Sequence, residues 1–370
     1  MRHIVKTTIL SAALIASSML FGAISSDAQT VKSQVVENGG TGPYKAMVAG
    51  DASLEKFTIY RPADLKAAVN AEGKLPVILY GNGGCQNSSI EIRYFLSELA
   101  SYGYVAVAIG PYDEDDFFAH WKDVMSGMYP ENKRVILANG EEVPKPTPEE
   151  VRQREENMQK MIAQMRAEAE KAAKEAAKKG KKNAAPAPAV PVARQATYAK
   201  QLLEAMDWLT DQNAQSSSEY YHMLDLEHVA VMGQSCGGAQ ALAVAHDPRI
   251  STCVILNSGI GDMEMQGCTQ EQLKNLHTPM FYLIGGPSDV AYENAAKDFR
   301  RIENVPVVMA NTIDGHEGTY YEKSGGLYAI AVRGWLDWQL KGDISQSAQF
   351  LSDKVFQLLY PEWEVVRKNF

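Results

Sequence analysis

The sequence predicts an α/β protein with a mostly parallel, doubly wound sheet that is interrupted by a charged helical insertion. Short, continuous apolar runs recur along the 370 residues, as expected for strands buried on both faces of a sheet. Amphipathic helical segments separate these runs, and the alternation of strand and helix is typical of a parallel sheet. The length and the 45% hydrophobic content suffice for one large domain or two ordinary ones.

The expected strands end in turns rich in glycine, serine, asparagine or aspartate, which sets their order along the chain. They cover residues 56–60, 75–80, 104–109, 229–232, 252–257, 279–284 and 305–310. Helices are expected after Ser88 or Ser89, from Tyr198 to Leu209, from Ala239 to Ala245 and from Tyr328 to Leu340. Residues 29–50 have no clear periodicity and are expected to form a loose leader.

The N-terminus has the pattern of a secretory signal peptide. Arg2, His3 and Lys6 precede an apolar stretch over residues 9–24, and small residues at Ser26 and Ala28 suit cleavage after Ala28. An anchor helix is the alternative, but serines interrupt the apolar stretch. The mature chain would be residues 29–370, secreted or periplasmic, and we find no other run long enough for a membrane span.

Residues 111–195 form the expected insertion, because they contain no recognisable core strand. Residues 151–182 carry ten Lys or Arg and five Glu, and an apolar stripe at helical spacing predicts a helix that Gly180 ends. A stiff Ala–Pro linker follows at residues 184–191. The insertion is interpreted as a solvent-exposed segment, and the alternatives are a lid or a partner-docking helix. The rest of the chain is acidic, with a net charge of −9 overall, which argues against nucleic acid or an anionic membrane as the main partner.

The most informative stretch runs from Val229 to Gly238. An apolar run there meets Gly233-Gln-Ser235-Cys-Gly237, and a helix-like run follows. This is the pattern of a nucleophile elbow, a strand-to-helix turn that presents a serine at the end of a sheet. Ser235 is therefore predicted to be the nucleophile of a hydrolase; the alternative is an ordinary glycine-rich turn.

Two further residues of the types that a serine hydrolase needs follow later strands. Asp289 comes 54 residues after Ser235, and His316 comes 27 residues after Asp289. Each of them follows an expected strand. His316 would take the proton of Ser235, and Asp289 would orient the imidazole. The backbone N–H of Cys236 and that of Gly83 or Gly84 would form the oxyanion hole. Asp262 and Asp314 are the alternatives for the acid. The other candidate histidines are disfavoured as the base by their positions in the chain: His120, His228, His246 and His277.

All four cysteines lie in the expected mature chain, and secretion permits disulfides. Cys85 lies in the predicted oxyanion loop and Cys236 next to the nucleophile, so a bridge between them would brace the hole. Cys253 and Cys268 would form a second pair, and buried free thiols are the alternative.

These motifs resemble the α/β-hydrolase superfamily, and more narrowly secreted esterases of the dienelactone-hydrolase and polyester-hydrolase (cutinase-like) type. The resemblance covers residues 56–110 and 196–345. It rests on the loop 81–85, the elbow, Gly286–Asp289, Gly315-His316 and the segment 335–342. The chain differs from the usual pattern at Asn82, Gln234 and Cys236, where these families more often have other residues.

The resemblance implies a Ser235–Asp289–His316 triad that acts through an acyl-enzyme, with no metal and no organic cofactor. The expected substrate is a small-molecule or polymeric carboxylic ester. A peptidase or a lactone hydrolase is a variant of the same chemistry. The alternative from another class is a non-catalytic envelope protein that binds a partner through the basic arm at residues 150–182.

Overall fold

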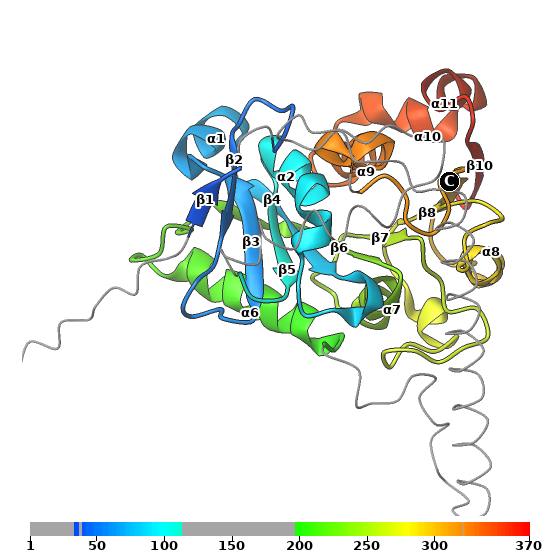
Figure 1. The fold of residues 1–370 in the computed structure, drawn as a ribbon, viewed down its shortest axis with the longest axis horizontal. Coiled ribbons are helices and arrows are strands. Elements are labelled where there is room, and N and C mark those ends of the chain that lie inside the picture. Colours follow the sequence, from blue (N-terminus) through cyan, green and yellow to red (C-terminus); the bar gives the residue numbers. More distant parts are fainter. Residues whose placement is uncertain (1–32, 37–38, 113–196, 321) are drawn as a thin grey trace, which may run out of the picture. The chain divides into compact units, whose positions relative to one another are not determined.

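The computed structural model describes residues 33–36, 39–112, 197–320 and 322–370, and a ten-stranded sheet runs through these residues (Figure 1). The strands are β1 (Ser33–Val35), β2 (Ala46–Ala49), β3 (Phe57–Pro62), β4 (Leu75–Gly81), β5 (Val105–Ile109), β6 (Leu224–Gln234), β7 (Thr252–Leu256), β8 (Met280–Ile284), β9 (Val307–Asn311) and β10 (Glu364–Lys368).

The strand order is β1-β2-β3-β5-β4-β6-β7-β8-β9-β10. The run from β5 to β9 is parallel throughout, whereas β1, β2 and β3 on one side and β10 on the other are antiparallel. The prediction of a mostly parallel α/β sheet is confirmed. All parallel strands therefore end at the same edge of the sheet.

Helices cover both faces of the sheet, because alternate residues of each central strand point to opposite sides. Ile78 and Tyr80 of β4 join one buried cluster, and Val77 and Leu79 join the other. The first cluster includes side chains of α2 (Arg93–Ser101), α9 (Gly326–Gln339), α10 (Ala348–Leu351) and α11 (Asp353–Leu359). The second includes side chains of α1 (Leu65–Glu72), α6 (Lys200–Ala214), α7 (Cys236–Val244) and α8 (Tyr292–Arg301).

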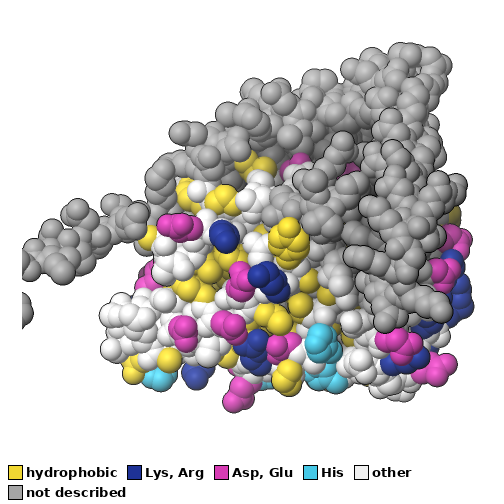
Figure 2. Space-filling model, turned by 90° about the horizontal axis from the view of Figure 1, so that it is seen from below, with side chains coloured by type: hydrophobic (Ala, Val, Ile, Leu, Met, Phe, Trp, Pro, Cys, Tyr) yellow, Lys and Arg dark blue, Asp and Glu magenta, His cyan; other side chains and the backbone are white. Residues whose placement is uncertain are grey.

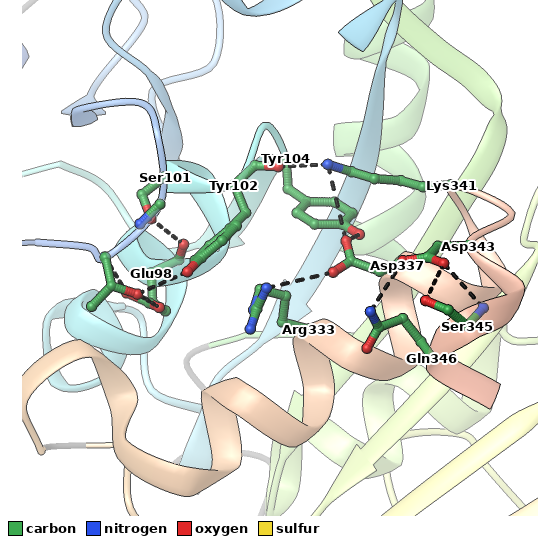
Figure 3. A network of polar contacts seen from close by, with 12 residues as sticks. Glu98, Ser101, Tyr102, Tyr104, Arg333, Asp337, Lys341, Asp343, Ser345 and Gln346 are labelled. Carbon is green, nitrogen blue, oxygen red and sulfur yellow. Dashed lines mark hydrogen bonds and ion pairs between the residues drawn. The ribbon is translucent and has the colours of Figure 1, made fainter. Parts of the chain in front are cut away.

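A polar network fastens α9 to the sheet at the starting end of β5 (Figure 3). The Tyr104 hydroxyl donates to the Asp337 carboxylate at 2.7 Å, and Lys341 donates to the Tyr102 carbonyl at 2.6 Å. Lys341 also stacks over the Tyr104 ring, with 4.6 Å between its nitrogen and the ring centroid. Since parallel strands begin at this end, the network lies at the edge of the sheet opposite to the strand ends.

Two expectations about the periphery of the fold were wrong or incomplete, and two others lie outside the described residues. The leader expected at residues 29–50 contains β1 and β2, which pair in succession onto β3. Strand β6 begins at Leu224, five residues earlier than expected, through the polar segment Asp225–His228. The signal peptide with its cleavage site after Ala28 lies outside the described residues, as does the insertion at 111–195 apart from residues 111 and 112.

Candidate active site

Four loops that follow parallel strands meet at one edge of the sheet. Ser235 comes directly after β6, Asp289 lies five residues after β8, and His316 lies five residues after β9. The short 3₁₀ turn η1 (Gly83–Cys85) follows β4, which is the neighbour of β6. Loops beyond the carboxyl ends of parallel strands are the usual place for a functional site in open α/β sheets.

Ser235 lies in a strained turn between β6 and α7. Its φ of 52° and ψ of −119° are unusual for a residue with a side chain. The turn is tight enough that a Cβ on Gly237 would lie 2.0 Å from the Gly81 carbonyl oxygen, and one on Gly233 would lie 2.1 Å from the Gly237 oxygen. Glycine at both positions therefore allows the backbone to turn sharply beside β4 and to present the serine.

The Ser235 hydroxyl, the His316 imidazole and the Asp289 carboxylate form one chain of hydrogen bonds. Ser235 Oγ lies 2.9 Å from His316 Nε2, and His316 Nδ1 lies 2.7 Å from Asp289 Oδ1. Because an ionised carboxylate only accepts, Nδ1 carries the proton and Nε2 faces the serine as an acceptor. This is the tautomer that a general base for the serine hydroxyl requires.

The Asp289 side chain is fully buried and held on both oxygens. Oδ1 also accepts from the Ala291 N–H at 2.9 Å, and Oδ2 accepts from the Gly285 N–H at 2.9 Å and the Asn257 amide at 2.8 Å. Burial by itself raises the pKa of Asp289. The hydrogen bond and charge of His316, together with the backbone N–H groups, outweigh burial and leave the pKa below its usual value.

The pKa of His316 is shifted in the opposite direction to that of Asp289. Burial by itself lowers the pKa of His316, but its hydrogen bond to Asp289 and the charges of Asp289 and Glu317 outweigh that effect and raise the pKa above its usual value. The same pair of groups thus favours an ionised aspartate and stabilises a positive charge on the histidine when it forms.

The turn η1 is tied directly to the elbow by a disulfide between Cys85 and Cys236, as the sequence predicted. The Cα atoms of the two cysteines are 5.2 Å apart. Gln234 also connects the two loops, since a Cβ on Gly83 would lie 1.9 Å from its amide oxygen. In the described part of the chain, no backbone hydrogen bond joins the N–H of Gly84 or Cys236 to a residue outside its own helix.

The expected bridge between Cys253 and Cys268 is wrong, because the structure has both as free, buried cysteines. Cys253 lies on β7 and is fully buried in the cluster that includes α7 and α8, and Cys268 belongs to the same cluster. Burial raises the pKa of both thiols, that of Cys268 to about 12. Both cysteines therefore pack as small neutral hydrophobic residues.

One alternative histidine and one alternative aspartate form ion pairs elsewhere in the fold. His228 contacts Asp225 at the start of β6, and Asp262 forms ion pairs with Lys297 and Arg301. His120 lies outside the described residues.

Asn257 was not predicted as a site residue, yet its side-chain amide contacts both the Asp289 carboxylate and the carbonyl of Gly315. Its position directly after β7, before Ser258 and Gly259, is the signal that could have found it.

Neither a metal centre nor a membrane span is found among the residues that the structure describes. No group of three or more His, Cys, Asp or Glu in those ranges could hold a metal ion, and none of the helices there is both long and apolar enough to cross a bilayer. On the face drawn in Figure 2, acidic and basic side chains of the described residues are interspersed. The basic arm at 150–182 lies outside the described ranges.

Comparisons with known proteins add no assignment to this geometry. No protein-family model matches the chain, and no curated protein matches it either.

Proposed function

We propose that this chain is a secreted serine hydrolase of the α/β-hydrolase fold that cleaves carboxylic esters through an acyl-enzyme. The observation that carries the proposal is the hydrogen-bonded chain from Ser235 through His316 to the buried Asp289 carboxylate. A serine hydroxyl is a weak nucleophile until a base removes its proton, and these three groups supply the base and its orienting acid. Their order along the chain is the order found in α/β-hydrolases.

In the first half-reaction, Ser235 Oγ attacks the ester carbonyl carbon while its proton moves to His316 Nε2. The negative charge of Asp289 stabilises the imidazolium that results. The carbonyl oxygen becomes an oxyanion, which accepts hydrogen bonds from the N–H of Cys236 and that of Gly84 or Gly83. The tetrahedral intermediate then collapses, the alcohol leaves with the proton from Nε2, and the acyl group stays on Ser235.

In the second half-reaction, His316 takes a proton from a water molecule that attacks the acyl carbon. The second tetrahedral intermediate expels Ser235 Oγ, which regains a proton from Nε2, and the carboxylic acid is released. Preorganised donors around the oxyanion are worth about 10²–10³ in turnover each in hydrolases of this kind. The disulfide beside Cys236 supports such preorganisation, because it joins the two loops that would supply the donors.

The proposed location is the periplasm or the exterior of the cell. The signal-like N-terminus supports it, and so does the disulfide, because such bonds persist in oxidising compartments.

A fluorophosphonate probe tests the proposal, since it reacts covalently with activated serines. We expect one adduct on the peptide that contains Ser235, and turnover of p-nitrophenyl acetate or butyrate that falls about 10⁴-fold or more in Ser235→Ala. Ser251→Ala is the matched control, because Ser251 also makes hydrogen bonds but precedes β7 at the opposite edge of the sheet. Wild-type-like turnover by Ser235→Ala would falsify the proposal. Parallel peptide and lactone panels separate an esterase from the two related activities.

A further inference from the structure

The Asn257 side chain joins the Asp289 carboxylate to the backbone carbonyl of Gly315, the residue directly before His316. Asn257 follows β7 directly, its side chain is fully buried, and its φ is 44°. Asparagine tolerates this left-handed conformation better than most residues with a side chain. Its backbone N–H donates to the Leu283 carbonyl at 2.8 Å, which fixes the residue against the end of β8.

The Asn257 amide group uses both of its hydrogens. Nδ2 donates to Asp289 Oδ2 at 2.8 Å and to the Gly315 carbonyl at 2.9 Å. Both acceptors lack a proton to give, so the nitrogen must face them and the amide has a single orientation. Gly315 directly precedes His316, so one side chain connects the acid and the backbone that carries the base.

The other side of the amide is held by an aromatic cluster. The Tyr320 hydroxyl donates to Asn257 Oδ1, and the Tyr320 ring packs edge-on against Tyr328 and Phe95. Tyr328 in turn shares a hydrogen bond with Thr312 Oγ1 at 3.0 Å. These contacts restrain Asn257, so the side chain acts as a fixed strut.

On the proposed function, we infer that Asn257 is a positioning residue for the Asp289–His316 pair. It aims Asp289 Oδ1 at His316 Nδ1 by holding Oδ2, and it keeps the His316 peptide at a constant distance from that carboxylate. An amide is suited to this position because it offers two donors without adding charge beside a pair that depends on charge balance. The loss of such a strut displaces the base, and misplacement of about 1 Å costs roughly 10²-fold in rate.

The substitution that separates positioning from simple packing is Asn257→Asp, which keeps the shape and adds a carboxylate. The titratable groups in contact with Asn257 are Asp289, Tyr320 and Tyr328. Behind them, His316 acts on Asp289, Glu317 on His316 and Asp314 on Tyr328. When ionised, the introduced carboxylate repels Asp289 and favours a positive charge on His316. We expect the acidic limb of kcat/KM to move to higher pH by about one unit or more.

Three further variants belong to the test. Asn257→Ala should lower kcat about 10- to 100-fold with little change in KM, because a positioning residue makes no contact with substrate. Tyr320→Phe should also lower kcat, but by less than Asn257→Ala, because the ring still fills the core. Asn213→Ala is the matched control: Asn213 also bridges a backbone N–H and a carbonyl, both of Leu224 at the far end of the sheet, and its loss should leave the pH profile unchanged.

An NMR titration of the His316 imidazole gives a readout that needs no substrate. Isotope-labelled histidine, assigned with His316→Gln, should show a higher His316 pKa in Asn257→Asp than in the wild type. If the wild type neither labels with fluorophosphonate nor turns over esters, the proposed function fails, whereas a shifted His316 pKa still supports the role of Asn257. If esters are cleaved but Asn257→Asp keeps the wild-type pH profile, kcat and His316 pKa, the inference about Asn257 is overturned.

Discussion

Removal of the disulfide between Cys85 and Cys236 should cost about 5 kcal/mol in the free energy of unfolding. The two cysteines are separated by 151 residues in the sequence. A cross-link over a loop of that size restricts the unfolded chain by about 17 cal/mol/K in the chain-entropy model, which is about 5 kcal/mol at 25 °C. Much of that loop is chain that the structure does not describe, and loop length enters only logarithmically. Deletion of residues 148–190 should therefore lower the contribution by only about 0.3 kcal/mol.

The assay is urea unfolding followed by tryptophan fluorescence, with the double variant Cys85→Ala/Cys236→Ala beside the wild type. A reductant should lower the wild-type midpoint toward that of the double variant and leave the double variant unchanged. Cys268→Ala is the control, because it removes a buried cysteine that is not bonded and should keep the response to reductant. Equal midpoints for the wild type and the double variant, after peptide mapping has shown the bond in the wild type, would refute the reasoning.

Three other perturbations follow from the same contacts. The kcat/KM of the wild type should fall with decreasing pH through a midpoint above the ordinary value of 6.5, because the pKa of His316 is raised and only the neutral imidazole is a base; a pH–rate profile measures this. Gly237→Ala should lower both the urea midpoint and the activity strongly, by roughly 3 kcal/mol or more in stability, because the new Cβ would meet the Gly81 backbone. Gly342→Ala is the comparison without a clash, because its Cβ would meet no atom within 4 Å and its only cost is the strain of a φ of 69°. Burial raises the pKa of Asp298 to about 6, so the fold favours its protonated form, and the stability of the wild type relative to Asp298→Asn should fall as pH rises from about 4 to 6 in urea titrations.

The central strands could be predicted because each is a short apolar run buried on both faces and bounded by turn residues. The edge strands could not. Strand β10 carries Glu364, Arg367 and Lys368 and is only partly buried, so its sequence alternates weakly. The start of β6 could not be predicted for the same reason. Residues 225–228 are polar in the main and only partly buried or exposed, although the strand itself includes them.

Some residues of the candidate site could likewise be predicted from local sequence patterns, whereas others depend on contacts between distant parts of the chain. Ser235, Asp289 and His316 could be predicted to lie near one another because each follows a strand, and parallel strands end at one edge. The pairing of Cys85 with Cys236 follows from the adjacency of the two loops, whereas Cys253 and Cys268 were paired on count and spacing alone. Asn257 escaped notice because its contacts are made 32 and 58 residues away, with a carboxylate and a backbone oxygen that no local pattern reveals.

The strain at Ser235 explains why the loops around it are joined so heavily. A side-chain-bearing residue at a φ of 52° costs roughly 1–3 kcal/mol, and it persists only where its neighbours determine the backbone. The Ser235 N–H donates to the Leu256 carbonyl at 2.9 Å, and Ser258 Oγ donates to the Ser235 carbonyl at 2.6 Å. The disulfide then fixes the next residue, Cys236, to the turn after β4. The end of β7 supplies the clamp on Ser235 through Ser258 and the strut to Asp289 through Asn257. A shift of that single strand end would therefore move Ser235 and Asp289 together, which makes the loop after β7 as decisive for the geometry as the turn at Ser235 itself.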